Sequence, residues 1–120
     1  MSRLKQNING SSTRFECEDL DAGLPMHAHK PDSGQEHDIH CVVGSLIVYI
    51  HPDEHYVVKA GETIRPDTTR WHGIVPLEVG TVFINTNDLD NGVSSTVLEA
   101  PHQAPDWVLQ LRDALAGEHQ

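Results

Sequence analysis

The chain has 120 residues, and its 18 acidic and 8 basic side chains give a formal net charge of −10 with the histidines counted as neutral. A chain of this length is expected to form one domain around a single core. Its negative charge, which no local cluster of Lys and Arg offsets, argues against nucleic-acid and anionic-membrane partners.

Residues 1–12 are polar and are predicted to be a flexible segment, followed by a single domain over residues 13–120. From Thr13 onward, Gly, Pro, Asp and Asn cut the chain into short segments, a pattern typical of an all-β sandwich or barrel. An N-terminal strand is expected around Arg14–Glu18. The clearest further strands are His37–Val43, Leu46–His51, His55–Lys59, Trp71–Val75 and Thr81–Thr86.

One short C-terminal α-helix is predicted over about residues 105–116. Pro105 suits the first turn, and Asp106 lies near the positive end of the helix dipole. Val108, Leu111 and Leu115 form an apolar stripe, which predicts packing against the outer face of a sheet rather than a partner-binding surface.

Alternation along the strands predicts which side chains point inward, because successive residues of a strand face opposite sides. In His37–Val43, the more apolar face carries His37, Ile39, Cys41 and Val43, which places His40 on the outside. In Trp71–Val75, His72 shares a face with Ile74. The opposite face is also apolar, so the pattern indicates an inward-pointing His72 less clearly than an inward-pointing His37.

The stretch "HAHKPDSGQEHDIHCVVG", from His27 to Gly44, holds four of the nine histidines. His27 and His29 are two residues apart, so on a strand both imidazoles point to one side and can reach one metal ion. Two plainer interpretations stay open. The pair can be solvent-exposed histidines on a polar strand, and His72 can be a hydrogen-bonded core residue beside Trp71.

Over about residues 23–76 the sequence resembles the cupin superfamily. The first motif is carried by "GLPMHAH" and by Gly44, which follows His37 with six residues between them. At the position of His37 the family usually has Glu, and Glu36 lies one position away. The second motif is carried by "GETIRPDTTRWH", which places Gly61 and His72 with ten residues between them. The resemblance implies a double-stranded β-helix, also called a jelly-roll barrel.

The resemblance further implies a mononuclear metal site similar to that of small four-histidine cupins. Strand phase and the spacing to Gly44 favour His37 over Glu36, which stays as the alternative ligand. The implied ligands are His27, His29, His37 and His72. Imidazole ligands suit one divalent transition metal ion, namely Fe, Mn, Ni, Cu or Zn, without selecting among them. The residues expected by strand phase to line a substrate pocket are Ile39, Cys41, Ile74 and Phe83.

The family resemblance implies a metal-dependent oxidoreductase, dioxygenase-like, that acts on a small organic substrate; it assigns no catalytic residues. The alternatives are a non-catalytic cupin that binds a metal or small ligand for sensing or storage, and a cupin isomerase or dehydratase. Small cupins commonly dimerise through edge strands, so a homodimer that uses the strand around Arg14–Glu18 is expected.

Two cysteines outside any CxxC pair favour a reducing compartment. The N-terminal residues contain no apolar signal-peptide core. The longest apolar stretch, "CVVGSLIVYI", has about half of the roughly 20 residues that a membrane-spanning helix needs. The sequence therefore predicts a soluble, cytoplasmic protein.

Overall fold

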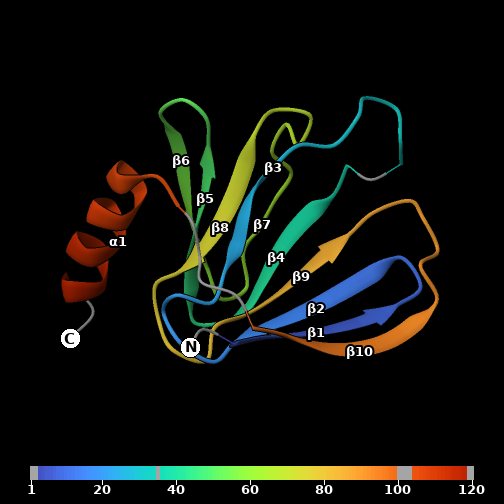
Figure 1. The fold of residues 1–120 in the computed structure, drawn as a ribbon, viewed down its shortest axis with the longest axis horizontal. Helices are drawn as coiled ribbons and strands as arrows, with labels where there is room; N and C mark the ends of the chain where they lie inside the picture. The colour runs from blue at the N-terminus through green and yellow to red at the C-terminus, as the bar shows by residue number, and fades with distance from the viewer. Residues whose placement is uncertain (1–2, 35, 100–103, 119–120) are drawn as a thin grey trace.

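The computed structural model describes residues 3–34, 36–99 and 104–118. Within these ranges, two antiparallel sheets face each other and one helix lies outside them (Figure 1). In chain order the elements are β1 (Arg3–Asn9), β2 (Ser12–Cys17), β3 (Leu24–His27), β4 (Asp38–Val43), β5 (Ser45–Ile50), β6 (Glu54–Lys59), β7 (Thr63–Ile64), β8 (His72–Pro76), β9 (Val82–Thr86), β10 (Val93–Glu99) and α1 (Asp106–Glu118). The predicted all-β class with a C-terminal helix is confirmed.

The larger sheet has six strands in the order β10-β1-β2-β9-β4-β7, and the smaller has four in the order β3-β8-β5-β6. Side chains from both sheets meet in an apolar core, in which Phe15 stacks on Phe83 with ring centroids 4.9 Å apart. The other buried residues of this core are Leu4, Cys17, Ala22, Ile39, Cys41, Leu46, Val48, Val58 and Ile74. Burial of this apolar surface is the main force that holds the two sheets together.

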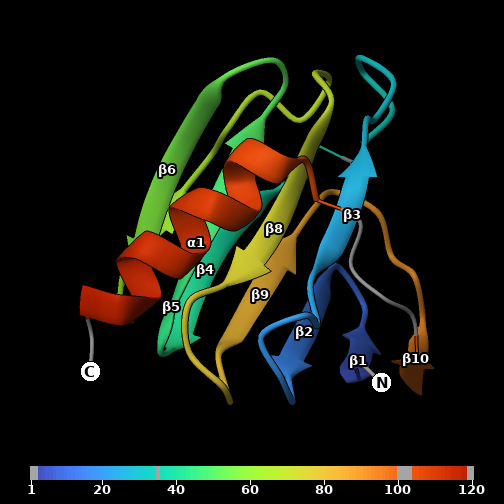
Figure 2. The same ribbon diagram turned by 60° about the vertical axis from the view of Figure 1, so that its left-hand side comes forward.

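Helix α1 covers the outer face of the four-stranded sheet (Figure 2). Val108 is fully buried there among Ile47, Tyr49, Val75 and Leu77. The predicted packing of the helix stripe is confirmed, and it explains the two apolar faces of the strand around His72. All of β8 is buried because one face meets the core and the other meets the helix. With 13 residues, α1 has neither the length nor the apolar character to cross a bilayer.

The N-terminal prediction is wrong in two respects. Residues 3–9, expected to be flexible, form β1, which pairs with β10 on one side and with β2 on the other. The strand expected at a free edge around Arg14–Glu18 is β2, which lies between β1 and β9 inside the sheet. β1 is largely polar, so its order comes from ladders on both sides rather than from a sequence pattern.

Val43 was expected inside and is 52% exposed. The register of β4 against β9 shifts between Cys41 and Val43, which is a β-bulge. Such a bulge adds a residue to one strand and reverses the phase of the side chains that follow. Gly44 comes next with a φ of 80°, and a Cβ there would lie 2.5 Å from the Thr81 hydroxyl oxygen. Glycine is therefore required at this corner.

Candidate metal centre

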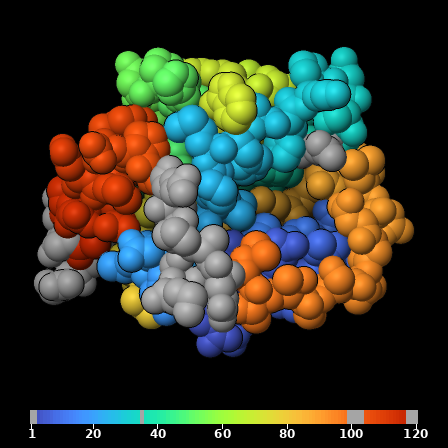
Figure 3. Space-filling model, in the orientation of Figure 1, coloured from blue at the N-terminus to red at the C-terminus, as the bar shows by residue number. Residues whose placement is uncertain are grey.

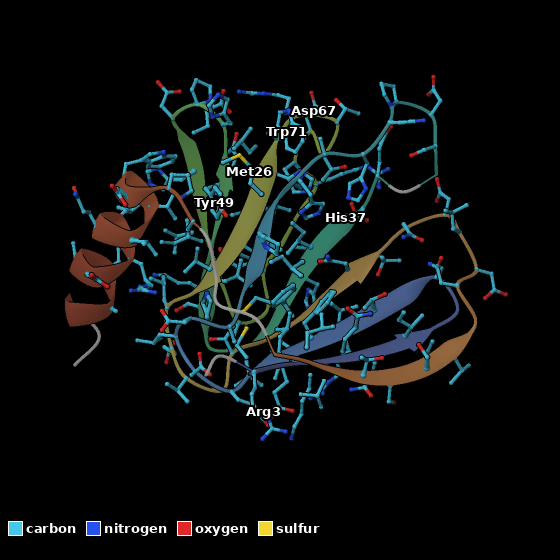
Figure 4. The ribbon with its side chains drawn as sticks, in the orientation of Figure 1. Arg3, Met26, His37, Tyr49, Asp67 and Trp71 are labelled. Carbon is cyan, nitrogen blue, oxygen red and sulfur yellow. The ribbon has the colours of Figure 1, made fainter. Side chains whose placement is uncertain are left out.

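Four histidines converge at one end of the space between the sheets. His27 ends β3 and His72 begins β8, where the two residues face each other in the ladder. His29 follows two residues after β3, and its backbone N–H donates to the carbonyl of Thr68 at 2.9 Å. His37 directly precedes β4 (Figure 4). One candidate ligand nitrogen from each ring lies within 4.8 Å of the other three. We call these four residues the histidine cluster.

A bulge in β3 turns His27 toward this cluster. Leu24 pairs with Ile74 and His27 pairs with His72, so three steps along β3 match two along β8. Leu24 packs on the core between the sheets, whereas Met26 packs on the side of α1. In a regular strand, residues three apart point to opposite faces, so His27 would point away from the face that Leu24 occupies. The extra residue of the bulge brings His27 back to that inner face.

Backbone carbonyls hold two of the rings in a defined tautomer. The Nδ1–H of His27 donates to the carbonyl oxygen of Pro25 at 2.7 Å, and that of His72 donates to Arg70 at 2.8 Å. A carbonyl oxygen only accepts, so Nδ1 carries the proton and the lone pair of each neutral ring is on Nε2. Two nearby carboxylates are engaged elsewhere, Asp38 with Arg65 and Asp67 with Thr69.

Two ring nitrogens of the cluster are buried and have no hydrogen-bond partner among the described residues. His72 Nε2 and His37 Nδ1 are both inaccessible to solvent, and neither has a hydrogen-bond partner within the described residues. Buried polar atoms are nearly always paired, so two such atoms in one cluster indicate a missing partner. Both atoms can donate a lone pair to a cation. The residues present therefore fit a metal ion.

The surroundings keep these rings neutral. Burial, together with the positive charge that His72, His29 and His27 would carry if protonated, lowers the pKa of His37 to about 3. Burial likewise lowers the pKa of His72 to about 4. A protonated imidazole cannot bind a metal ion. The two rings are therefore in the ligand form at neutral pH.

The spacing of the rings is close to that of a mononuclear site. Ring centroids lie 5.0 Å apart for His27 and His29, and 5.7 Å apart for His37 and His72. With nitrogen–metal distances of roughly 2.0–2.1 Å, two nitrogens on opposite sides of an ion are about 4.2 Å apart. Nitrogens within 4.8 Å of one another therefore need only small inward movements to share one ion.

The structure separates the candidate ligands from their neighbours. Glu36, the alternative to His37, lies outside the cluster, and its carboxylate accepts the backbone N–H of Asp32 at 3.1 Å. His40 points away from the core, as strand phase predicts, and its Nδ1 lies 2.6 Å from the Thr63 hydroxyl oxygen. His37, by contrast, is buried, with 4% of its surface exposed.

A cavity of about 370 Å³ adjoins the cluster. Its lining consists of Thr13, Phe15, Leu24, His27, His29, His37, Asn85, Asn87 and Asn91. Figure 3 shows a hollow on this face, bordered by β3 and by the chain that leads from β9 into β10. His72 is fully buried, and the other three histidines of the cluster line the cavity. An ion held by the histidine cluster would therefore face the cavity.

The residues expected to line a substrate pocket lie deeper than this cavity. Ile39, Cys41, Ile74 and Phe83 are fully buried in the core between the sheets. Phe15, which stacks on Phe83, lines the cavity in its place. Strand phase identifies the inner face of a strand, but it does not say at which depth other side chains cover that face.

The asparagines of the cavity were not identified from the sequence. Asn85 is two residues after Phe83 on β9, so the alternation that placed Phe83 inside also places Asn85 inside. Asn87 and Asn91 belong to the connection from β9 to β10 and carry no periodic signal. Their participation depends on how that connection folds over the inner face.

Searches with protein-family models, against curated proteins and against solved structures found no significant match. The candidate metal centre therefore rests on the arrangement of its own side chains.

Proposed function

We propose that the histidine cluster holds one divalent transition metal ion and that the protein is a metal-dependent oxidoreductase, dioxygenase-like, acting on a small organic substrate in the adjoining cavity. The observation that carries this proposal is the convergence of four imidazoles within 4.8 Å, with buried nitrogens of His37 and His72 that no described residue partners. The oxidoreductase part comes from the resemblance to cupins.

Fe, Mn, Ni, Cu and Zn all suit imidazole ligands. A bound ion would supply a Lewis acid or a redox centre. The four rings are neutral donors, so they leave the double positive charge of such an ion uncompensated and favour an anionic substrate oxygen beside it. The carbonyls of Pro25 and Arg70 fix the direction of two rings, as outer hydrogen bonds do for metal-bound histidines. Phe15 and Leu24 give the cavity an apolar wall.

The cupin assignment is part of the same proposal. Two facing antiparallel sheets with four clustered histidines are compatible with the jelly-roll barrel of that family. We also propose a homodimer, although β2 is not available as its edge. The sheets end at β10 and β7 and at β3 and β6, and such a contact would use one of these strands. The mass of the protein in solution tests it. Two buried free cysteines, Cys17 and Cys41, support residence in the reducing cytoplasm.

A non-catalytic cupin that binds a small ligand is the second candidate. It is favoured by the cavity lining, where the described residues include no carboxylate, lysine or arginine. Among the described lining residues, acid–base chemistry of the isomerase or dehydratase type would have only the histidines to use, and these are engaged by the proposed ion.

Elemental analysis of protein purified without an affinity tag, followed by measurement of oxygen uptake, tests the proposal. We expect one equivalent of a redox-active metal and oxygen consumption with an enediol, a diketone or a phenolic compound. Stoichiometric zinc with no oxygen consumption would leave the ligand-binding alternative. Absence of metal after growth in metal-supplemented medium would contradict the metal site itself.

A further inference from the structure

Asn85 lines the cavity, and it has a buried hydrogen-bond acceptor that no described residue uses. It lies in the middle of the six-stranded sheet, paired with Thr13 of β2 and with Ile39 of β4. Its side-chain Oδ1 is inaccessible to solvent and has no hydrogen-bond partner among the described residues. A buried acceptor without a partner is costly to the fold. An apolar residue at the same inner position would avoid this cost, so the fold alone does not explain the unpaired oxygen.

The other two asparagines of the cavity already serve the chain. The Oδ1 of Asn87 accepts the backbone N–H of Leu89 at 3.0 Å, and the Nδ2 of Asn91 donates to the carbonyl of Leu89 at 3.4 Å. Both side chains therefore shape the connection between β9 and β10. Asn85 is different, because it lines the cavity and its buried Oδ1 has no hydrogen-bond partner among the described residues.

The charge of the lining limits what a ligand can carry. No acidic, lysine or arginine side chain lines the cavity in the described part of the chain. An anionic group is stabilised only next to the proposed ion, and any further charge would be buried without a partner at high cost. The net charge of −10 also disfavours ligands with more than one negative charge. At about 370 Å³, the cavity is near the lower limit for small-molecule sites.

We propose that the cavity binds a small monoanion that carries a hydroxyl group beside its metal-binding oxygen, and that Asn85 accepts a hydrogen bond from this hydroxyl. The inference rests on the metal centre proposed above and names the ligand class of that site. Two kinds of compound share the chemistry, namely α-hydroxycarboxylates and enediolates. Asn85 is the residue that selects the hydroxyl, and Phe15 and Leu24 contact the carbon skeleton.

The test uses the protein loaded with Co²⁺, whose visible spectrum changes when its ligands change. Metal content is measured first, and the protein is then titrated with lactate, propionate, malate and ascorbate. Lactate and propionate differ only in the hydroxyl group, malate adds a second carboxylate to lactate, and ascorbate represents the enediolates. We expect tighter binding of lactate than of propionate, tighter binding of ascorbate than of propionate, or both. Malate should bind more weakly than lactate.

Two variants locate the effect. Asn85→Leu should reduce the preference for lactate over propionate, or the affinity for ascorbate, by about 5-fold or more, while affinity for propionate changes less than about 2-fold. Asn91→Leu is the matched control, because it removes an amide from the same cavity whose N–H is already used in the loop. It should leave the preference unchanged within about 2-fold.

The outcomes separate the two proposals. Failure to bind Co²⁺ would contradict the metal centre and, with it, this inference. Stoichiometric Co²⁺ with equal affinities for all four compounds would overturn the inference alone. An Asn85→Leu variant that retains the full preference would also overturn it and leave the metal centre standing. So would malate bound as tightly as lactate, where lactate binds more tightly than propionate.

Discussion

His27 and His72 occupy opposite positions in the β3–β8 ladder, and their ring centroids lie 4.3 Å apart. Each ring donates its Nδ1–H to the carbonyl of the residue two positions earlier, Pro25 for His27 and Arg70 for His72. The backbone of two paired strands thus fixes both rings before any ligand binds. Changes to this oriented pair should therefore have clear effects on the site.

Replacement of His27 tests the metal site directly. His27→Ala removes one of four converging ligand nitrogens. Loss of a hydrogen bond outside the ligand shell alone costs roughly 10–100-fold in metal affinity, so loss of a ligand should cost at least about 100-fold. Elemental analysis after dialysis should find far less than one equivalent of metal.

His40→Ala is the matched control for that variant. His40 lies on β4, three residues after His37, but its ring contacts Thr63 on the other face of the strand. Its removal should leave the metal content at one equivalent. Equal metal content in both variants would place the bound ion somewhere other than the histidine cluster.

Much of the site follows from sequence patterns, for a physical reason. Alternation along a strand has a strict period of two, and it correctly separates His37 from His40. What the patterns miss depends on long-range packing. The bulge that turns Val43 outward is not encoded in the alternation, and β1 is ordered by its neighbours. Phe15 of β2 stacks on Phe83 of β9, and this contact likewise depends on two strands that are distant in the sequence.

The metal-free protein should lose stability as the pH falls below neutral. In the folded chain the pKa is lowered to about 3 for His37 and to about 4 for His72, whereas unfolded histidine titrates near 6.5. Between these limits the unfolded state binds more protons, so acid favours it. At pH 4.5 each of these two histidines should lower the free energy of unfolding by on the order of 2 kcal/mol relative to pH 7.

Urea denaturation of the metal-stripped protein at both pH values measures this loss. Carboxylates also titrate in the range, so the comparison is with His37→Gln, which has no titratable group at this position. The variant should lose less stability on acidification than the wild type. An identical loss in the two proteins would show that His37 does not carry the effect.

Gly73 is expected to be intolerant of any side chain. A Cβ there would overlap the phenol of Tyr49 and lie 2.9 Å from the carbonyl oxygen of Leu24 (Figure 4 shows Tyr49 on the side of α1). Gly73→Ala must therefore displace β3, β5 or both. Overpacking of this kind costs about 1–3 kcal/mol. Denaturant unfolding should show that loss, and a variant as stable as the wild type would mean that Tyr49 has room to move.

Truncation of the helix contact should reduce stability without affecting the metal site. Val108 belongs to α1 and is fully buried where the helix packs on the four-stranded sheet. This contact lies on the face of the sheet opposite the core between the sheets. Val108→Ala removes two methyl groups there and should lower the free energy of unfolding by about 1–3 kcal/mol. Gln110→Ala, at an exposed position of the same helix, should change it by less than about 0.5 kcal/mol. Both variants should bind one equivalent of metal, because β8 and β5 separate the helix from the histidine cluster. If Val108→Ala loses more metal than its unfolded fraction accounts for, the helix positions His72 through β8. Packing on the helix face of β8 and metal binding on its inner face would then be energetically coupled.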